Sequence, residues 1–378
     1  MEALYSNILN LTWQQVVMWI LGGILIFLAI KKEMEPSLLL PIGFGAILVN
    51  LPMSGAVTQF VDGVQQGEAG ALTTLYNAGI ANELFPLILF IGIGAMIDFG
   101  PLLSNPKLMV FGAAAQFGIF FTLCLASMFF PVNDAASIGI IGAADGPTSI
   151  VVAMALKSNY VGAIMVAAYS YMALVPIIQP PVIKLLTTKK ERLIRMPYKP
   201  ASVSKLTRIL FPIVITVITG IVAPSSVSLV GFLMFGNLLR ECGCLDRLSE
   251  TAQNTLANLI TLLLGITISF SMRADQFVNR NTLIIMGLGL VAFVFDSIAG
   301  VMFAKLLNLF SKKKVNPMVG AAGISAFPMS ARVIQKMGLE ADPQNHLLMH
   351  AVGANVAGQI ASVLAGGMIL NLVPQLLK

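Results

Sequence analysis

The chain has 378 residues, of which 57% are hydrophobic and 11% are charged, and its mean hydropathy is +0.87. Because soluble proteins carry about 25% charged residues, this composition excludes a soluble globular protein and indicates a polytopic membrane protein. The excess of six positive charges lies in short connections, where basic residues set membrane topology, and does not indicate a nucleic-acid partner.

Twelve apolar segments follow one another along the chain, and several are too short for a straight span of about 20 residues. We therefore predict an all-α polytopic membrane protein in which some helices are broken or re-entrant. The segments lie near residues 14–30, 37–52, 84–99, 108–130, 137–156, 160–184, 206–222, 225–239, 256–271, 282–304, 317–336 and 345–373.

A basic stretch divides the chain into two similar halves. The predicted parts are a first membrane repeat (residues 1–184), a basic cytoplasmic linker (185–205) and a second membrane repeat (206–378). Three short motifs recur in the same order in both halves, which predicts a duplication. The matching pairs are 35–44 with 223–232, 89–95 with 262–268, and 142–145 with 320–323.

Charge placement indicates that the two repeats have inverted topology. The connection 53–83 contains no Lys or Arg and is expected outside. The positive-inside rule assigns to the cytoplasmic side the basic positions Lys31–Lys32, Arg240–Arg247, Lys305–Lys314 and Arg332–Lys336. All of these side assignments are satisfied together if the fifth segment enters the membrane from outside and turns back, and the eleventh segment enters from inside and turns back. This scheme puts both termini outside and places an ion site where the two broken helices meet near the midplane.

The most informative motif is residues 142–149, Gly-Ala-Ala-Asp-Gly-Pro-Thr-Ser, in the fifth segment. It places Asp145 between helix-breaking residues at membrane depth, where a charge usually faces a polar interior. Gly146 and Pro147 free backbone carbonyls beside the carboxylate, and Thr148 and Ser149 add hydroxyls. Since hard cations prefer oxygen ligands, the motif predicts a site for Na⁺ or H⁺.

The eleventh segment, residues 316–332, is interrupted by Gly and Pro in the same way. Asn316, Ser325 and Ser330 offer neutral oxygens, and Arg332 offers a fixed cation. We expect Ser325 to complete a site opposite Asp145. The alternative is that these small hydroxyls bond only to the backbone of their own turn.

Two further segments carry polar side chains at membrane depth. Asn355, Gln359 and Ser362 recur at i, i+4 and i+7, which is one helical face. Such a stripe either lines a site or joins helices, and we expect Asn355 in the site. In Tyr169-Ser-Tyr171, a tyrosine either relays a proton or belongs to an interfacial belt.

Other ionisable residues carry weaker signals. Asp296 is a second intramembrane carboxylate, which either binds an ion or pairs with an Arg. His346 and His350 are four residues apart, but no third metal ligand is visible. Asp62 and Glu68 are expected to be solvated. The chain carries no nucleotide-binding motif, so an ion pump would need another energy source.

These motifs resemble the β subunit of the sodium-pumping biotin-dependent decarboxylases, which act on oxaloacetate, methylmalonyl-CoA, glutaconyl-CoA or malonate. The resemblance covers nearly the whole chain. It depends on residues 142–148, on 316–320 continuing to 328–332, and on Gly353-Ala-Asn355 with Gly358. The N-terminus resembles the acyl-CoA types more than the longer oxaloacetate type.

The resemblance implies a division of labour among subunits. A carboxyltransferase α subunit moves a carboxyl group to biotin on a separate carrier protein, and a small membrane-anchor γ/δ subunit completes the complex. The β subunit, expected as a homo-oligomer in the bacterial cytoplasmic membrane, decarboxylates carboxybiotin, exports Na⁺ and consumes a proton. No covalent cofactor is expected on this chain.

The resemblance also implies roles for individual residues. The Na⁺-linked aspartate is Asp145, and the proton-linked tyrosine is Tyr171. The implied sodium ligands are Asp145, Ser325, Asn355 and Asn316. The residues implied for carboxybiotin are Arg332, Asn316 and Ser325, with Arg332 as the partner of its carboxylate.

A different class of protein remains compatible with composition and topology. A Na⁺-coupled secondary transporter, either a Na⁺/H⁺ antiporter or a Na⁺/carboxylate symporter, uses the same inverted-repeat architecture. The distinguishing property is dependence on carboxybiotin, because a transporter moves Na⁺ on a pH or solute gradient alone.

Overall fold

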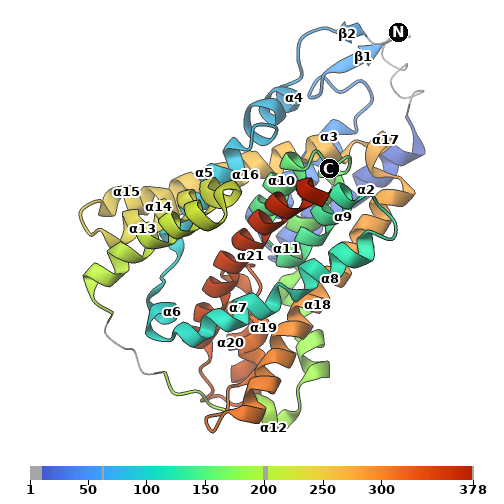
Figure 1. Ribbon diagram of the computed structural model, residues 1–378. Helices are drawn as coiled ribbons and strands as arrows, with labels where there is room; N and C mark the ends of the chain where they lie inside the picture. Colours follow the sequence, from blue (N-terminus) through green and yellow to red (C-terminus); the bar gives the residue numbers. More distant parts are fainter. Residues whose placement is uncertain (1–10, 62–63, 199–202, 377–378) are drawn as a thin grey trace.

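A computed structural model describes residues 11–61, 64–198 and 203–376, and these residues are mostly helical (Figure 1). The helices of the first half are α2 (Trp13–Lys31), α3 (Pro36–Val49), α4 (Ala71–Leu75), α5 (Leu84–Met96), α6 (Gly100–Ser104), α7 (Met109–Ala115), α8 (Phe117–Ala126), α9 (Val132–Gly139), α10 (Gly146–Ala155) and α11 (Val161–Leu186). Those that follow are α12 (Lys189–Arg192), α13 (Lys205–Val222), α14 (Val227–Glu241), α15 (Asp246–Thr251), α16 (Ala257–Ile268), α17 (Ala274–Phe277), α18 (Arg280–Phe310), α19 (Pro317–Ala321), α20 (Met329–Ala341) and α21 (Leu348–Leu376).

Short turns of tighter or wider helix interrupt or extend these elements. The 3₁₀ turns are η2 (Pro106–Leu108), η3 (Ile140–Ala143), η4 (Pro224–Ser226) and η6 (Ser269–Met272), and the π turns are η1 (Tyr76–Ile80) and η5 (Ala252–Leu256). One antiparallel hairpin, β1 (Gln59–Val61) and β2 (Val64–Gln66), lies in the connection 53–83. The all-α class is therefore confirmed, with this small hairpin as the part that the sequence pattern did not predict.

Within the described residues, six helical stretches are long and apolar enough to cross a membrane, so the chain is a multi-pass membrane protein. They are Trp13–Lys31, Pro106–Ala126, Val161–Leu186, Asp246–Met272, Arg280–Phe310 and Leu348–Leu376. A seventh candidate is the pair Ala71–Ile80 and Leu84–Met96, which is bent by 62°. Helices α3, α9 with η3, and α10 are apolar but shorter, as the short apolar segments predicted.

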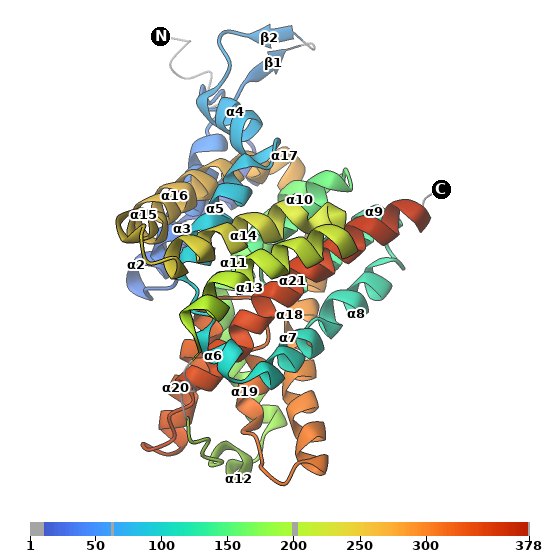
Figure 2. The ribbon, with the colours of Figure 1, turned by 60° about the vertical axis from the view of Figure 1, so that its left-hand side comes forward.

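The helices form two groups, and each half of the chain contributes to both (Figure 2). One group contains α2, α3 and α5 from the first half with α13, α14 and α16 from the second. The other contains α7 to α11 with α18 to α21. The largest buried cluster lies mainly in the second group, where Phe111, Phe293, Met318 and Ile360 are among its members.

Each half also contains a hairpin of two short helices joined by a break. In the first hairpin, α9 with η3 leads to α10, and its two outer ends meet where Ser158 Oγ donates to Asp134 Oδ1 (2.7 Å). In the second hairpin, α19 leads to α20. Its outer ends meet at the linker, where Asn316 and Asn345 both donate to Arg192 O (3.0 and 2.9 Å). Both segments predicted to turn back therefore do so.

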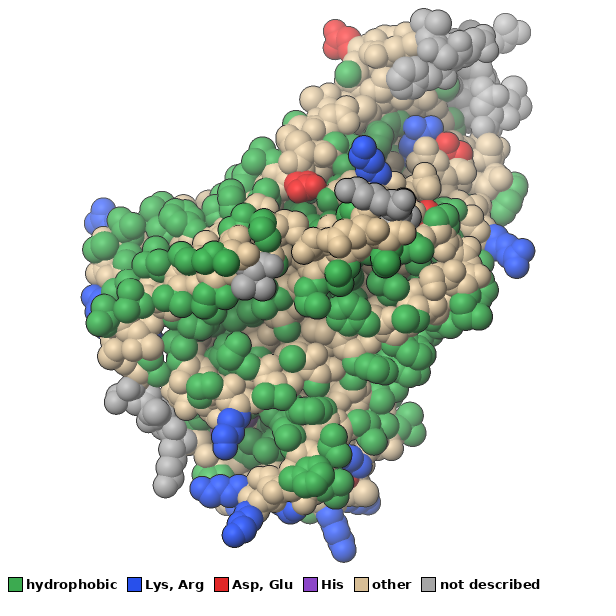
Figure 3. Space-filling model, viewed as in Figure 1, with side chains coloured by type: hydrophobic (Ala, Val, Ile, Leu, Met, Phe, Trp, Pro, Cys, Tyr) green, Lys and Arg blue, Asp and Glu red, His purple; other side chains and the backbone are tan. Residues whose placement is uncertain are grey.

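Basic side chains gather at the end of the molecule that contains α12, at the lower end of Figures 1 and 3. The β1–β2 hairpin lies at the opposite end. Between them, hydrophobic side chains cover much of the visible face (Figure 3). Phe27, Phe117, Val217 and Leu283 are among the large hydrophobic side chains that are exposed, which suits contact with lipid.

Candidate functional site

The start of α10 positions Asp145. Ala144 adopts a left-handed conformation (φ 52°) that ends η3, and Asp145 is the N-cap of the next helix. Pro147 lies in the first turn of α10, where backbone N–H groups have no partner within the helix, so the N–H that proline lacks is not needed there. The Thr148 N–H donates to Asp145 Oδ1 (3.3 Å). The Gly-Pro sequence thus turns the chain and fixes the carboxylate at the break.

The Asp145 carboxylate is 3% exposed and is held by neutral donors. Its Oδ2 accepts hydrogen bonds from Thr148 Oγ1 (2.8 Å), Gln359 Nε2 (2.9 Å) and Ser362 Oγ (3.0 Å). None of the ion pairs among the described residues includes Asp145. Since Oδ2 has three donors and Oδ1 has one long contact, Oδ1 is the less satisfied oxygen.

The break between α19 and α20 contacts the break that carries Asp145. The Ser325 N–H donates to Ala143 O (3.0 Å), which joins the two hairpin tips through their backbones. The Ser325 hydroxyl lies within interaction range of the Asp145 carboxylate. It is buried and makes no hydrogen bond to a described residue. Ser325 therefore lies opposite Asp145, and its hydroxyl oxygen is not used in a hydrogen bond to another described residue.

The polar stripe of α21 bridges both hairpin tips. Asn355 Nδ2 donates to Ile324 O in the second break (2.6 Å), while Gln359 and Ser362 donate to Asp145 in the first. The other amide atom, Asn355 Oδ1, is buried and has no hydrogen-bond partner in the described parts of the chain. The stripe thus lines the site and also joins the helices.

The two tyrosines of α11 face different surroundings. The Tyr171 hydroxyl donates to Met286 O of α18 (2.5 Å). The Tyr169 ring instead packs against Gly146, where an added Cβ would overlap it. The Tyr169 hydroxyl is buried without a hydrogen-bond partner among described residues. Tyr169 is therefore the tyrosine next to the start of α10, and the sequence analysis did not single it out.

Asn316 lies at the outer end of the second hairpin and holds the linker. Its Oδ1 accepts from Met318 N (3.1 Å) as the N-cap of α19, and its Nδ2 donates to Arg192 O (3.0 Å) and Ile194 O (2.9 Å). His350 Nε2 also contacts the linker at Met196 O (3.1 Å). All the side-chain hydrogen bonds of Asn316 go to the linker and its own helix, and none goes to Asp145.

An ion pair fastens the same linker on the surface. Arg195 Nε donates to Asp342 Oδ2 (2.6 Å), and Arg195 Nη1 donates to Gln344 Oε1 (2.8 Å). The hydrogen bond from Arg195 lowers the pKa of Asp342. The Asp342 carboxylate is therefore ionised at neutral pH, and the pair is lost only when the pH falls through that lowered pKa.

We expect Asn316→Ala to release residues 192–196 from the second hairpin. Trypsin should then cleave after exposed Arg195 about 30-fold faster, because two hydrogen bonds of roughly 1 kcal/mol each are lost and every 1.4 kcal/mol is a factor of ten. Limited proteolysis of the membrane-embedded protein measures this rate. Asn308→Ala is the matched control, since the Asn308 side chain bonds only to the backbone of Val315 among the described residues. Equal cleavage rates in both variants would contradict the linker role.

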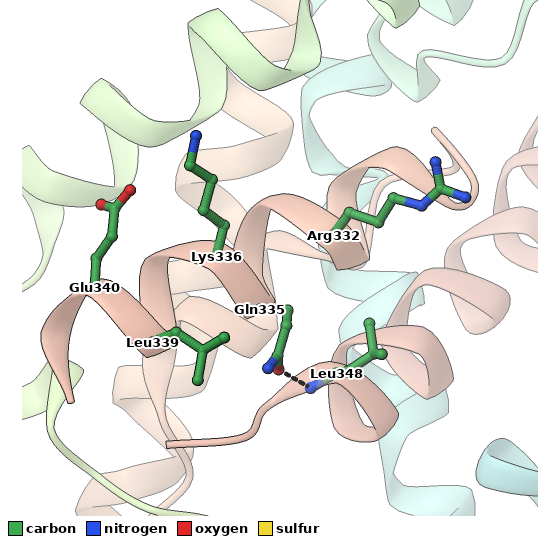
Figure 4. A pocket seen from close by; sticks show the side chains of 6 residues that line it. All are labelled: Arg332, Gln335, Lys336, Leu339, Glu340 and Leu348. Carbon is green, nitrogen blue, oxygen red and sulfur yellow. Dashed lines mark hydrogen bonds between the residues drawn. The ribbon is translucent and has the colours of Figure 1, made fainter. Parts of the chain in front are cut away.

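Arg332 lies on the exposed face of α20, at the edge of a cavity of 540 Å³ (Figure 4). Gln335 in the same cavity accepts from Leu348 N (2.7 Å) and so ties α20 to the start of α21. Figure 4 shows Arg332 and Glu340 at opposite ends of this face. Arg332 forms no ion pair or hydrogen bond with a described residue, and Glu35 is the carboxylate that it influences at longer range.

Four other sequence candidates lie away from Asp145 or have different partners. Ser330 Oγ donates to Gln179 Oε1 (2.9 Å), so it joins α20 to α11. His346 Nδ1 lies 3.4 Å from Gln335 Nε2, whereas His350 contacts the linker, so the two histidines do not share a partner. Asp296 has no Arg partner among the described residues, which corrects the pairing considered from the sequence.

Asp62 lies outside the described residues, and Glu68 is exposed as expected.

Comparison with known proteins supports the resemblance. The family model for the Na⁺-transporting oxaloacetate decarboxylase beta subunit matches residues 14–373. The glutaconyl-CoA decarboxylase subunit beta of Acidaminococcus fermentans is 49% identical over 369 residues, covering 97% of this chain and 96% of the relative. The methylmalonyl-CoA decarboxylase subunit beta of Propionigenium modestum is 47% identical over 379 residues, covering 96% of each. A probable oxaloacetate decarboxylase beta chain of Vibrio cholerae is 46% identical over 421 residues, covering 97% of each.

The match extends over nearly the full length of the chain and of these relatives, so it includes both hairpins and α21. A family of decarboxylase components is favoured over the secondary-transporter alternative. The chain belongs to the β-subunit family of the Na⁺-transporting decarboxylases.

Proposed function

We propose that this subunit binds Na⁺ at Asp145, releases CO₂ from carboxybiotin, and exports the ion while a proton is taken up. The observation that carries the proposal is the convergence of two broken helices and the polar stripe of α21 on one buried carboxylate. Three neutral donors prepare this carboxylate to carry charge, and because it has no cationic partner in the described structure, its charge is neutralised by a mobile cation, either Na⁺ or a proton.

The oxygens left free by the hydrogen-bond network suit Na⁺. Asp145 Oδ1 has one long contact, and Ser325 Oγ and Asn355 Oδ1 have no partner in the described structure. These atoms supply a carboxylate, a hydroxyl and an amide oxygen, which are ligands of the hard-cation type. Asp145, Ser325 and Asn355 are therefore the proposed sodium ligands. Asn316 is the weakest of the four candidates, because its hydrogen bonds go to the linker.

Competition at one carboxylate provides a means of coupling. Asp145 holds either Na⁺ or a proton, since each neutralises the same charge. The proposed path of the proton involves Tyr171, whose hydroxyl contacts α18. Tyr169, packed against Gly146, is the nearer hydroxyl from which a proton would reach Asp145.

The basic end of the molecule is proposed to face the cytoplasm, in agreement with the positive-inside rule. Arg332, in the first turn of α20, is free to bind the carboxylate of carboxybiotin presented by a carrier protein, because a guanidinium forms paired hydrogen bonds with a carboxylate. The substrate class is an acyl-CoA or oxo acid, acted on by a carboxyltransferase subunit. A small anchor subunit, further copies of this chain and a bacterial inner membrane complete the proposed assembly.

The two halves, residues 1–184 and 206–378, are proposed to be inverted repeats joined by the linker 185–205. Two observations support this. The first is that corresponding helices make corresponding contacts. Helices α2 and α3 of the first half pack on each other, as do α13 and α14 of the second. The second helix of each of these pairs also contacts the other half: α3 packs on α16, and α14 packs on α5. The first hairpin also lies toward the β1–β2 end of the molecule and the second toward α12 (Figure 1).

Thiol labelling tests this topology. In a variant whose three native cysteines are replaced, Lys157→Cys should react with an impermeant maleimide only from outside, and Lys336→Cys only from inside. The expectation follows because Lys157 lies just after α10 and Lys336 lies in the outer half of α20, in two hairpins that are proposed to enter from opposite sides. Right-side-out vesicles measure labelling from outside, and inside-out vesicles measure labelling from the cytoplasmic side. Labelling of both positions from the same side contradicts the inverted arrangement.

The function is tested by ²²Na⁺ uptake into inside-out proteoliposomes that contain the purified complex. Uptake should require the decarboxylase substrate and should be blocked by avidin, which binds biotin. Uptake driven by a pH gradient alone, without substrate and unaffected by avidin, would instead support an antiporter.

Arg332→Gln should lower carboxybiotin decarboxylation about 10- to 100-fold. The loss corresponds to about 1.4–2.7 kcal/mol, the range of a charge-assisted hydrogen bond. Lys336→Gln is the matched control, because Lys336 is a cation one turn further along the same face of α20. The decarboxylation rate with free carboxybiotin measures both variants. A similar loss of decarboxylation rate in both variants would mean that any positive charge on this face of α20 has the effect, and that Arg332 has no specific role.

A further inference from the structure

A second carboxyl group is buried in the helix packing beside the first hairpin. Asp296 lies in α18, is 1% exposed, and has no hydrogen-bond partner among the described residues for either carboxyl oxygen. It takes part in none of the ion pairs of the described structure. The mechanism above does not use this group.

Two glycines of the first half make room for the carboxyl group. A Cβ added at Gly142 would lie 2.9 Å from Asp296 Oδ2, and one added at Gly118 would overlap Oδ1. Gly142 belongs to η3, three residues before Asp145. Asp296 therefore packs directly against the broken helix that carries the proposed sodium ligand.

A backbone acceptor lies one helical turn before the carboxyl group. The position of a Cβ on Gly118 is also 2.6 Å from Ala292 O, so this carbonyl oxygen and Asp296 Oδ1 both lie close to Gly118. A protonated carboxyl group at position 296 can donate to this carbonyl of the preceding turn, as Ser and Thr hydroxyls do.

No fixed positive charge faces Asp296. Within α18, Arg280 and Lys305 are 16 and 9 residues away, which corresponds to about 24 and 14 Å along the helix axis. The elements packed on α18 are α7, α8, α9, η3, α11 and α19. Their titratable or charged side chains are Cys124, Asp134, Tyr169, Tyr171 and Lys184. Of these, Lys184 is the only cation, and it lies in the last turn of α11, where it pairs with Glu340.

The start of α8 disfavours a metal ion beside Asp296. The backbone N–H groups of Gly118 and Ile119 face the carboxyl group, although neither forms a hydrogen bond with it in the described structure, and the Ile119 N–H donates to Gln116 O (3.2 Å) instead. The partial positive charge of these groups repels a metal cation and also favours the ionised carboxylate, but without a bonded donor it does not offset the cost of burying that charge. An ionised and unpaired carboxylate is too costly to bury and keeps its proton instead.

We infer that Asp296 is a proton-binding site, a neutral carboxylic acid that holds α18 against η3 and α8. Its ionisation would leave an unpaired charge in this packing, which only a separation of η3 or α8 from α18 would relieve. The site is distinct from Asp145, and its existence does not depend on the proposed function.

Infrared difference spectroscopy of the complex reconstituted in lipid tests the inference. The wild-type spectrum should contain a protonated carboxyl band that shifts in D₂O and is missing in Asp296→Asn. Asp134→Asn is the matched control: Asp134 is equally buried, but its carboxylate accepts from Ser158 Oγ, Asn159 N and Asn159 Nδ2. This control should keep the band. If Asp296→Asn does not assemble, Asp296→Glu with ¹³C-labelled aspartate removes the aspartate band instead.

Each outcome decides the inference. Loss of the band in Asp296→Asn alone, with no response of that band to added Na⁺, supports a proton site. A band that disappears when Na⁺ is added to the wild type identifies a metal-cation site and overturns the inference. Identical spectra for wild type and Asp296→Asn show an ionised carboxylate held by the start of α8, which also overturns it. None of these spectra requires the complex to decarboxylate its substrate, so the result remains valid if the proposed function is wrong.

Discussion

Asp145→Asn is expected to lower substrate-driven Na⁺ transport at least about 100-fold. The substitution keeps the size of the side chain but removes the charge that receives three donors at Oδ2 and that is proposed to hold the ion. Hydrogen bonds to charged groups contribute about 1.5–3 kcal/mol each, and every 1.4 kcal/mol is tenfold in binding. Uptake of ²²Na⁺ by proteoliposomes measures the effect.

Glu68→Gln is the control for this experiment, because it removes an exposed carboxylate from the connection between β2 and α4. It should transport Na⁺ like the wild type. If Asp145→Asn keeps its transport rate and its dependence on Na⁺ concentration, Asp145 is a structural cap of α10 and the ion site lies elsewhere. Binding of the complex to avidin confirms that each variant is assembled.

The breaks in the two hairpins were predictable because their cause is local. Gly and Pro interrupt a helix wherever they occur in sequence, so residues 142–149 and 316–332 indicate broken helices without knowledge of the fold. The polar stripe of α21 was predictable for the same reason, since a period of 3.6 residues places Asn355, Gln359 and Ser362 on one face. The contact between the two tips through Ser325 N and Ala143 O agrees with the expectation that the two broken helices meet.

The partners of individual side chains were not predictable, because they depend on how helices far apart in sequence are rotated against each other. Gln359 and Ser362 bind Asp145, while Asn355 binds the second break. Sequence spacing gives the shared face but not this division. Asn316 shows the same limit: an asparagine that caps a helix and holds a linker has the same sequence signature as an asparagine that binds an ion.

Tyr169 and Tyr171 are two residues apart in α11, so their side chains point in nearly opposite directions on the helix. Only the packing shows which direction leads to Gly146 and which to α18. The environment of Asp296 was also hidden in the sequence. An intramembrane carboxylate suggests a cationic partner, whereas the structure places glycines and a carbonyl oxygen beside it.

Gly358→Ala is expected to weaken Na⁺ binding about 5- to 150-fold. A Cβ at this position would lie 2.6 Å from Ile324 O and would overlap Gly323 O, both in the backbone of the second break. Backbone atoms cannot rotate away, so α21 must move from the hairpin tip, at the roughly 1–3 kcal/mol typical of overpacking. That movement carries Gln359 and Ser362 away from Asp145, and an energy of this size corresponds to the stated change in affinity.

Gly287→Ala is the matched control, because Gly287 lies within α18 and a Cβ there would meet nothing within 4 Å. Alanine at such a helical position should leave the protein unchanged or slightly stabilised. The Na⁺ concentration for half-maximal uptake measures the affinity, and the thermal unfolding midpoint separates it from global destabilisation. A wild-type sodium dependence in Gly358→Ala would mean that the close approach of α21 to the second break does not position the ligands. An increase in the half-maximal Na⁺ concentration without loss of folded protein instead ties sodium affinity to this single helix contact.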